Sequence, residues 1–99
     1  MHFLTFDVAE LDDGVSSLEA LASTATAQHA AVIAEVQQVL GWAWHRFLDS
    51  HGPIDDAMAW DHDLQVTVED GGLHTVTLTL TGTVRFVEMF IATFGSARD

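Results

Sequence analysis

The chain has no cysteine, no lysine, a single proline and only three arginines among its 99 residues. The lack of cysteine excludes a disulfide framework, a thiol nucleophile and any thiolate metal site. The scarcity of cations argues against nucleic-acid binding, because three arginines cannot offset the repulsion between phosphates and fifteen acidic residues. No run approaches the roughly 18 to 20 apolar residues that cross a bilayer. We therefore expect no direct contact with nucleic acid or membrane.

The N-terminal residues lack the basic region of a signal peptide, since the chain reaches Asp7 without a lysine or arginine. We expect a cytoplasmic protein. The length predicts a single domain over residues 1–99. Although the net charge is −12, 48% of the residues are hydrophobic, including six Phe and three Trp. This is ample apolar material for a core, so the charge does not indicate disorder.

The acidic residues are clustered. Eleven of the fifteen lie in residues 7–13 and 49–70, and residues 49–70 contain no basic residue. Such patches repel anionic surfaces and attract basic ones. High acidity is also a habit of some genomes and of salt-adapted organisms, so composition alone does not prove a function. The predicted partner-binding acidic patch consists of Asp49, Asp55, Asp56, Asp61, Asp63, Glu69, Asp70, Asp7, Glu10, Asp12 and Asp13.

Hydrophobic periodicity predicts the secondary structure. Alternation predicts a strand over residues 2–8. Helical spacing of apolar residues predicts one long helix over residues 15–48, with a cap at Asp13 or Ser16 and a bend near Gly41. Residues 49–63 read as an acidic loop with one helical turn over residues 54–60. The remaining elements are a hairpin, with strands over 64–69 and 73–81 joined by Asp70-Gly71-Gly72, and a short helix over 84–94 capped by Thr83 and closed by Gly95.

The element order predicts an α+β fold. We expect β-α-β-β-α along the chain, with a three-stranded antiparallel sheet and both helices packed on one face. Threonines of the hairpin, namely Thr67, Thr75, Thr77, Thr79 and Thr81, should line the other face as a solvated ladder.

The predicted long helix has an unusual second face. Small residues recur along it at spacings of four, three, four and three, whereas a helix normally turns a charged face to water. Small residues allow a second helix to approach closely, so we expect a homodimer. Alternatively, alanine simply fills a solvent face because it is the best helix former. The predicted dimer interface consists of Ala20, Thr24, Ala27, Ala31 and Ala34.

No residue pattern identifies a catalytic, cofactor or metal site. Asp61, His62 and Asp63 lie near His51, but adjacent residues of an extended segment point to opposite sides, and no His-x-x-x-His spacing occurs. Glycine-rich phosphate loops, dinucleotide fingerprints and serine-nucleophile motifs are absent. We expect neither an enzyme nor a resident cofactor or metal. Near the end of the long helix we expect Leu40, Trp44 and Phe47 to point inward and Trp42 elsewhere.

Two hypotheses on function follow. The first is a small, non-enzymatic protein that acts through association, as a homodimeric binding or scaffold module. The second is an acidic mimic of nucleic acid of phage origin, directed against CRISPR or restriction systems, or an immunity protein that blocks a basic toxin. Both require a protein partner with a basic surface, and the sequence does not name that partner.

Overall fold

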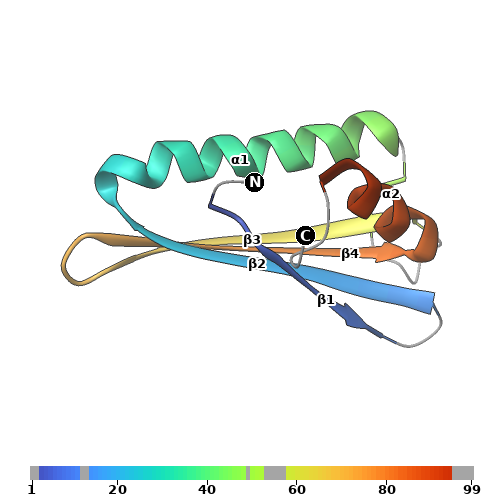
Figure 1. Ribbon diagram of the computed structural model, residues 1–99, viewed down its shortest axis with the longest axis horizontal. Helices are drawn as coiled ribbons and strands as arrows, with labels where there is room; N and C mark the ends of the chain where they lie inside the picture. Colours follow the sequence, from blue (N-terminus) through green and yellow to red (C-terminus); the bar gives the residue numbers. More distant parts are fainter. Residues whose placement is uncertain (1–2, 12–13, 49, 53–57, 95–99) are drawn as a thin grey trace.

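The computed structural model describes residues 3–11, 14–48, 50–52 and 58–94. Six elements follow one another: β1 (Phe6–Glu10), β2 (Val15–Ala25), α1 (Thr26–Arg46), β3 (Trp60–Glu69), β4 (Leu73–Thr83) and α2 (Val84–Phe94). The strands form one antiparallel sheet in the order β1-β2-β4-β3. Each half of the chain therefore contributes an edge strand, a central strand and a helix. Both helices lie on the same side of the sheet, with α1 along its length and α2 near one end (Figure 1).

The α+β class, the single antiparallel sheet and the two helices are confirmed, but the sheet has four strands rather than three. The residues expected to begin the long helix form β2 instead. Inside this strand Leu18, Ala20 and Ala22 are buried, whereas Leu21 is 60% exposed. A period of two is the pattern of a strand with one covered face. The strand is central, paired with β1 and β4, and this pairing outweighs the helix propensity of its Leu, Ala and Glu residues.

The hairpin prediction is confirmed, with strands longer than expected. Gly71 and Gly72 have φ of 89° and 81° in the turn between β3 and β4. Such positive φ values favour glycine, so the Gly-Gly pair fixes the position of the turn. The predicted helical turn over 54–60 lies largely outside the described residues, and its last residue, Trp60, begins β3.

The other element boundaries also differ in part. The first strand begins at Phe6 rather than at residue 2. Helix α1 has no side-chain cap at Ala25 and runs without a break through Gly41. Helix α2 begins where expected, and Phe86 N donates a hydrogen bond to the Thr83 hydroxyl over 3.4 Å. Its predicted end at Gly95, like the cap at Asp13, falls outside the described residues.

The core lies between the sheet and the helices. Helix α1 buries Val32, Val36, Val39 and Ala43, which recur at spacings of four, three and four. They meet the inward residues of the two central strands, and Ala20 and Ala22 leave room for the helix to lie close. Side chains in this core are Leu4, Phe6, Leu18, Ala20, Ala22, Val32, Val36, Val39, Ala43, Phe47, Trp60, Val76, Leu78, Leu80, Phe86, Val87 and Phe90.

Aromatic rings fill one end of this core. Trp60 is fully buried and stacks on Phe86 with ring centroids 5.6 Å apart. Trp42 is partly buried and meets the rings of Phe47, Phe86, Phe90 and Phe94, whereas Trp44 is 43% exposed. The orientations expected for Trp42 and Trp44 are therefore reversed. The cause is the helix register, because the inward stripe runs through Val39 and Ala43 rather than through Leu40 and Trp44.

Hydrogen bonds hold the N-terminal segment against α1. Phe3 N donates to both carboxylate oxygens of Glu35 (3.0 and 2.9 Å), and Leu4 N donates to one of them (3.0 Å).

Neither of the two described helices is long and apolar enough to cross a membrane.

Candidate functional site

The face of the sheet turned away from the helices is the first candidate site. Strand register places Asp7, Glu19, Thr79 and Asp63 in one row across all four strands, because each is the direct partner of the next. Directly paired residues share a face, and this row alternates with the buried residues of the core. No helix covers this face in Figure 1. We call it the open face.

Polar residues dominate the open face. Thr75, Thr77, Thr79 and Thr81 of β4 form the predicted threonine ladder, flanked by Ser17 and Ser23 of β2 and by Gln65 and Thr67 of β3. Within the ladder the Thr75 hydroxyl lies 3.1 Å from the Ser23 hydroxyl and donates to Glu69 Oε1 over 3.0 Å. Leu21 and Leu73 add exposed apolar area, at 60% and 42%.

Like charges lie next to each other in the open-face row. Asp7 of the edge strand β1 is the direct partner of Glu19 of the central strand β2. Opposed like charges destabilise a sheet. No salt bridge from an arginine to either residue occurs in the described part of the chain. The row therefore presents negative charge to the solvent without a cation beside it.

The cations lie elsewhere. Arg46 of α1 and Arg85 of α2 both line a pocket of about 360 Å³ on the helix side of the molecule, together with His45, Phe47, Leu48, Ser50 and Met89. Among the described residues these are the only two arginines. The carboxylates of the open-face row and the two described arginines therefore lie on opposite sides of the sheet.

The structure describes six of the eleven predicted patch acids. Asp7 and Asp63 lie on the open face, and Glu69 ends β3 on the same face. Asp70 lies in the hairpin turn. Glu10 lies on the helix side of the sheet, because its neighbour Ala9 pairs with Ser17 of the open face and successive residues of a strand point to opposite faces. Asp61 is the direct partner of Thr81 and so also belongs to the open face, and its carboxylate reaches His51 at the β3 edge, as described below. The predicted patch residues Asp12, Asp13, Asp49, Asp55 and Asp56 lie outside the described residues.

The predicted dimer interface is not a single helix face. Ala20 and Thr24 belong to β2, and Ala20 is 1% exposed in the core, so neither lies on a helix. Ala27, Ala31 and Ala34 lie on α1 and are exposed. The prediction is wrong for Ala20 and Thr24, because β2 is a strand and not part of the helix. For the three alanines of α1 it stays a prediction. Sequence reasoning missed Glu19, whose position becomes informative once β2 is known to be a central strand.

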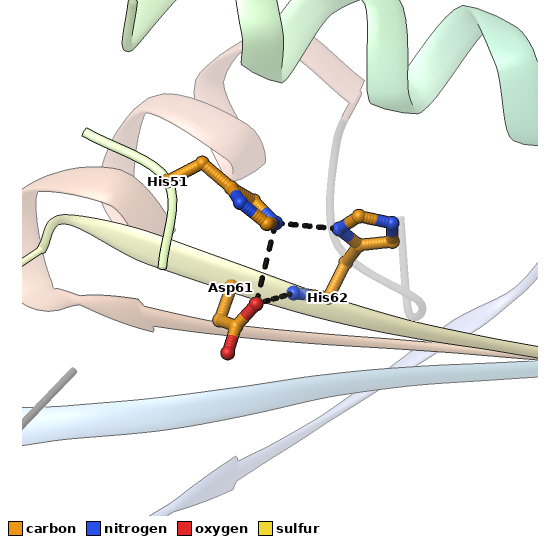
Figure 2. A group of neighbouring side chains, drawn as sticks. All are labelled: His51, Asp61 and His62. Atoms are coloured by element: carbon orange, nitrogen blue, oxygen red, sulfur yellow. Dashed lines mark hydrogen bonds and ion pairs between the residues drawn. The ribbon is translucent and has the colours of Figure 1, made fainter. Parts of the chain in front are cut away.

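A second candidate site lies at the β3 edge, where three metal-ligand side chains meet (Figure 2). After α1 ends, residues 50–52 run beside the start of β3, with His51 bridged in parallel to Trp60. Ala59 N donates to Ser50 O (2.9 Å) and Gly52 N donates to Trp60 O (3.0 Å). These backbone bonds hold the His51 ring over the edge of the strand.

Three polar atoms converge at this edge. His51 Nε2 lies 2.7 Å from His62 Nδ1 and 3.2 Å from Asp61 Oδ1. The carboxylate of Asp61 also accepts a hydrogen bond from His62 N over 2.8 Å, which turns it back along its own strand. Adjacent residues of a strand do point to opposite faces, but at an edge both side chains reach a third residue lying beside it. We call these residues the His51–Asp61–His62 cluster.

Aromatic rings enclose the cluster on one side. Trp44 of α1 lies against the His51 ring with centroids 4.4 Å apart, and Trp60 meets the same ring at 4.5 Å. Burial, and secondly the neighbouring His51, lower the pKa of His62 below its usual value, against the opposing effect of Asp61 and Asp63. His62 therefore favours the neutral imidazole, which leaves a nitrogen lone pair available.

Sequence reasoning did not predict this cluster. Residues 51 and 62 are eleven positions apart, a spacing typical of no metal motif, and their approach depends on the parallel bridge at Trp60. The local concentration of His and Asp was the only available signal.

Comparison with protein-family models, curated proteins and solved structures finds no match to this chain.

Proposed function

We propose that this chain is a non-enzymatic protein-binding module whose open face docks on a basic surface of a partner protein. The observation that carries the proposal is the row of Asp7, Glu19 and Asp63 on a sheet face that neither described helix covers. Complementary charge steers such encounters and suppresses wrong partners.

Protection of the sheet edges is the main alternative explanation for these acids. Charged residues on edge strands discourage pairing with another chain, which would account for Asp7 on β1 and Asp63 on β3. It does not account for Glu19, because β2 is a central strand with β1 on one side and β4 on the other. A carboxylate opposite Asp7 at that position lowers stability without protecting an edge. Selection for binding is a sufficient reason to keep it.

The rest of the open face suits docking. The threonine ladder gives a broad surface of hydroxyl groups, which can donate and accept hydrogen bonds with a partner. Leu21 and Leu73 supply apolar area that a partner would remove from water. A polar surface with two exposed leucines resembles the mixed composition of non-obligate interfaces.

Two kinds of basic partner protein fit this proposal. In one, the basic surface is a nucleic-acid channel, and the chain acts as an acidic mimic of the kind that phages direct against CRISPR or restriction systems. In the other, it is a basic protein without nucleic acid, such as a toxin held by its immunity protein. Competition with DNA distinguishes them, because only the mimic and DNA would exclude each other.

The test uses two variants that remove equal charge. The open-face variant Asp7→Asn, Glu19→Gln, Asp63→Asn neutralises the row, and the control variant Glu10→Gln, Asp70→Asn, Glu88→Gln neutralises three acids away from it. Proteins captured from the encoding organism by the immobilised wild-type chain should be lost with the open-face variant and kept by the control. Equal capture by all three would show that the row serves no partner.

A further inference from the structure

We propose that His51, Asp61 and His62 form a binding site for one divalent transition-metal ion of the zinc type. The two histidines lie on the helix side of the β3 edge, where His51 contacts Trp44 of α1, and Asp61 reaches them from the opposite side of the strand (Figure 2). The site uses none of the three carboxylates of the proposed docking row, Asp7, Glu19 and Asp63. Two imidazoles and one carboxylate are a donor set that suits Zn²⁺, Ni²⁺, Cu²⁺ and Co²⁺.

The hydrogen bonding of the cluster supports this assignment. His51 Nε2 and His62 Nδ1 lie 2.7 Å apart, a hydrogen bond in which either nitrogen can be the donor, and the carboxylate of Asp61 lies 3.2 Å from His51 Nε2. The proton of this bond therefore lies among three atoms that are all metal ligands once it is removed. A metal ion that replaces this proton would meet the three donors together, in keeping with the release of protons on metal binding.

The distances require only a small adjustment. In a tetrahedral site with bonds of about 2.0 to 2.1 Å, ligand atoms lie about 3.3 Å apart. The separation between His51 and Asp61 is 3.2 Å, and that between the two imidazoles is 2.7 Å. A widening of about 0.6 Å between the two rings brings the first two separations to this value, and the third, between His62 and Asp61, lies within 4.8 Å. His51 lies in a short segment beside the sheet rather than inside it, so its ring can make this movement.

The surroundings favour a defined site over scattered surface residues. The three ligand atoms all lie within 4.8 Å of one another, and no other group of three metal-capable side chains does so among the residues that the structure describes. His51 and His62 are each partly buried, and the bridge to Trp60 fixes the backbone of the loop-borne ligand. Three protein ligands would leave a fourth position for water or another ligand.

A second histidine pair in the same molecule provides a matched control. His29 of α1 and His74 of β4 have ring centroids 4.4 Å apart, comparable to the 4.8 Å between His51 and His62. No carboxylate completes that pair into a group of three in the described structure. Substitution of this pair therefore distinguishes Zn²⁺ binding by the His51–Asp61–His62 cluster from Zn²⁺ binding by any two adjacent imidazoles.

The experiment is calorimetric titration of the untagged chain with ZnCl₂ at neutral pH. We expect one Zn²⁺ per chain, and affinity at least about tenfold weaker in His51→Gln and in His62→Gln, since losing a ligand exceeds the effect of losing an outer partner. The double variant His29→Gln, His74→Gln should bind like the wild type. Absence of Zn²⁺ binding by the wild type, or equal loss in the control, would overturn the proposal.

Folding is checked independently by circular dichroism. If His62→Gln unfolds, His51→Gln decides the question, because its side chain lies outside the long strands. Co²⁺ gives a second readout, as the ion absorbs visible light according to its coordination and quenches nearby tryptophan fluorescence. We expect Co²⁺ to quench Trp44 and Trp60, which both contact the His51 ring, and we expect this quenching to be lost in His51→Gln. Unchanged quenching in His51→Gln would place the ion elsewhere and contradict the proposal.

Discussion

Asp7 and Glu19 lie directly opposite each other on neighbouring strands, on the face of the sheet turned away from α1 and α2. Two carboxylates in this relationship repel each other, and the next strands add Thr79 and Asp63 to the same row rather than a cation. An arrangement that lowers stability at a central strand calls for a compensating benefit. In the proposed function that benefit is attraction of a basic partner.

Removal of this repulsion should stabilise the protein. We expect Glu19→Gln to raise the free energy of unfolding by about 0.2 to 1 kcal/mol, the usual range for a cross-strand pair. The gain should shrink as salt rises, because exposed charges are screened. Denaturant unfolding at low and high salt measures both. Glu88→Gln, on the helix side, is the control, and a loss of stability in Glu19→Gln would mean that Glu19 has a favourable contact instead.

The pKa of His62 should lie below 6.5, the usual value for histidine. Burial is the larger cause and His51 the next, so His51→Gln should raise this pKa toward its ordinary value. Proton titration followed by NMR of the metal-free protein measures it. Because the folded-state pKa is lowered, this group makes stability rise with pH up to about 6.5 and fall on acidification below it. A pKa above 6.5 in the wild type would contradict the described environment.

Close packing at the end of the sheet gives a further prediction. Gly82 pairs with Ser16 and Trp60, and a Cβ at this position would overlap the ring of Phe86. Gly82→Ala should therefore destabilise the protein by about 1 to 3 kcal/mol, as overpacking does. Gly41→Ala is the control. Gly41 lies exposed in α1 with nothing within 4 Å of a new Cβ, so alanine there should stabilise by about 0.5 to 1 kcal/mol. Equal effects at both sites would contradict the packing around Phe86.

Self-association through α1 stays a prediction. Its outward face carries Ala27, Ala31 and Ala34, and the carboxylate of Glu35 is occupied by the backbone of residues 3 and 4. Light scattering at micromolar concentration should give about twice the mass of the 10.8 kDa chain. Ala27→Glu with Ala31→Glu should restore the monomer while the far-ultraviolet circular dichroism stays unchanged. A monomeric wild type would rule out this dimer.

Local chemistry explains which elements the sequence predicts. The hairpin is evident because the pair Gly71-Gly72 suits the positive φ values of the turn and the threonines alternate with buried Val76, Leu78 and Leu80. The strand β2 is not evident from the sequence, because Leu18, Leu21 and Ala25 recur at helical spacings of three and four. Only pairing with β4, some sixty residues later, decides between them. Tertiary contact thus overrides local propensity here.

The candidate sites follow the same division. The sequence shows the clustering of acids around the residues that form β3. It does not show the open-face row, because that row depends on Glu19 lying opposite Asp7. The His51–Asp61–His62 cluster depends on a bridge between residues 51 and 60 that no spacing rule predicts. Pairing between distant segments creates both sites, whereas composition reveals only the excess of charge.

The most direct test of the proposed function is the rate at which the purified partner associates with the chain as NaCl is raised from low to physiological concentration. For the wild type and for the control variant Glu10→Gln, Asp70→Asn, Glu88→Gln, we expect fast association that slows steeply with salt, because clustered opposite charges are screened over roughly 8 Å at physiological ionic strength. The variant Asp7→Asn, Glu19→Gln, Asp63→Asn should associate slowly, with a much weaker dependence on salt. If the open-face and control variants show the same rate and the same salt dependence, the row of carboxylates does not guide binding, and the central claim is wrong.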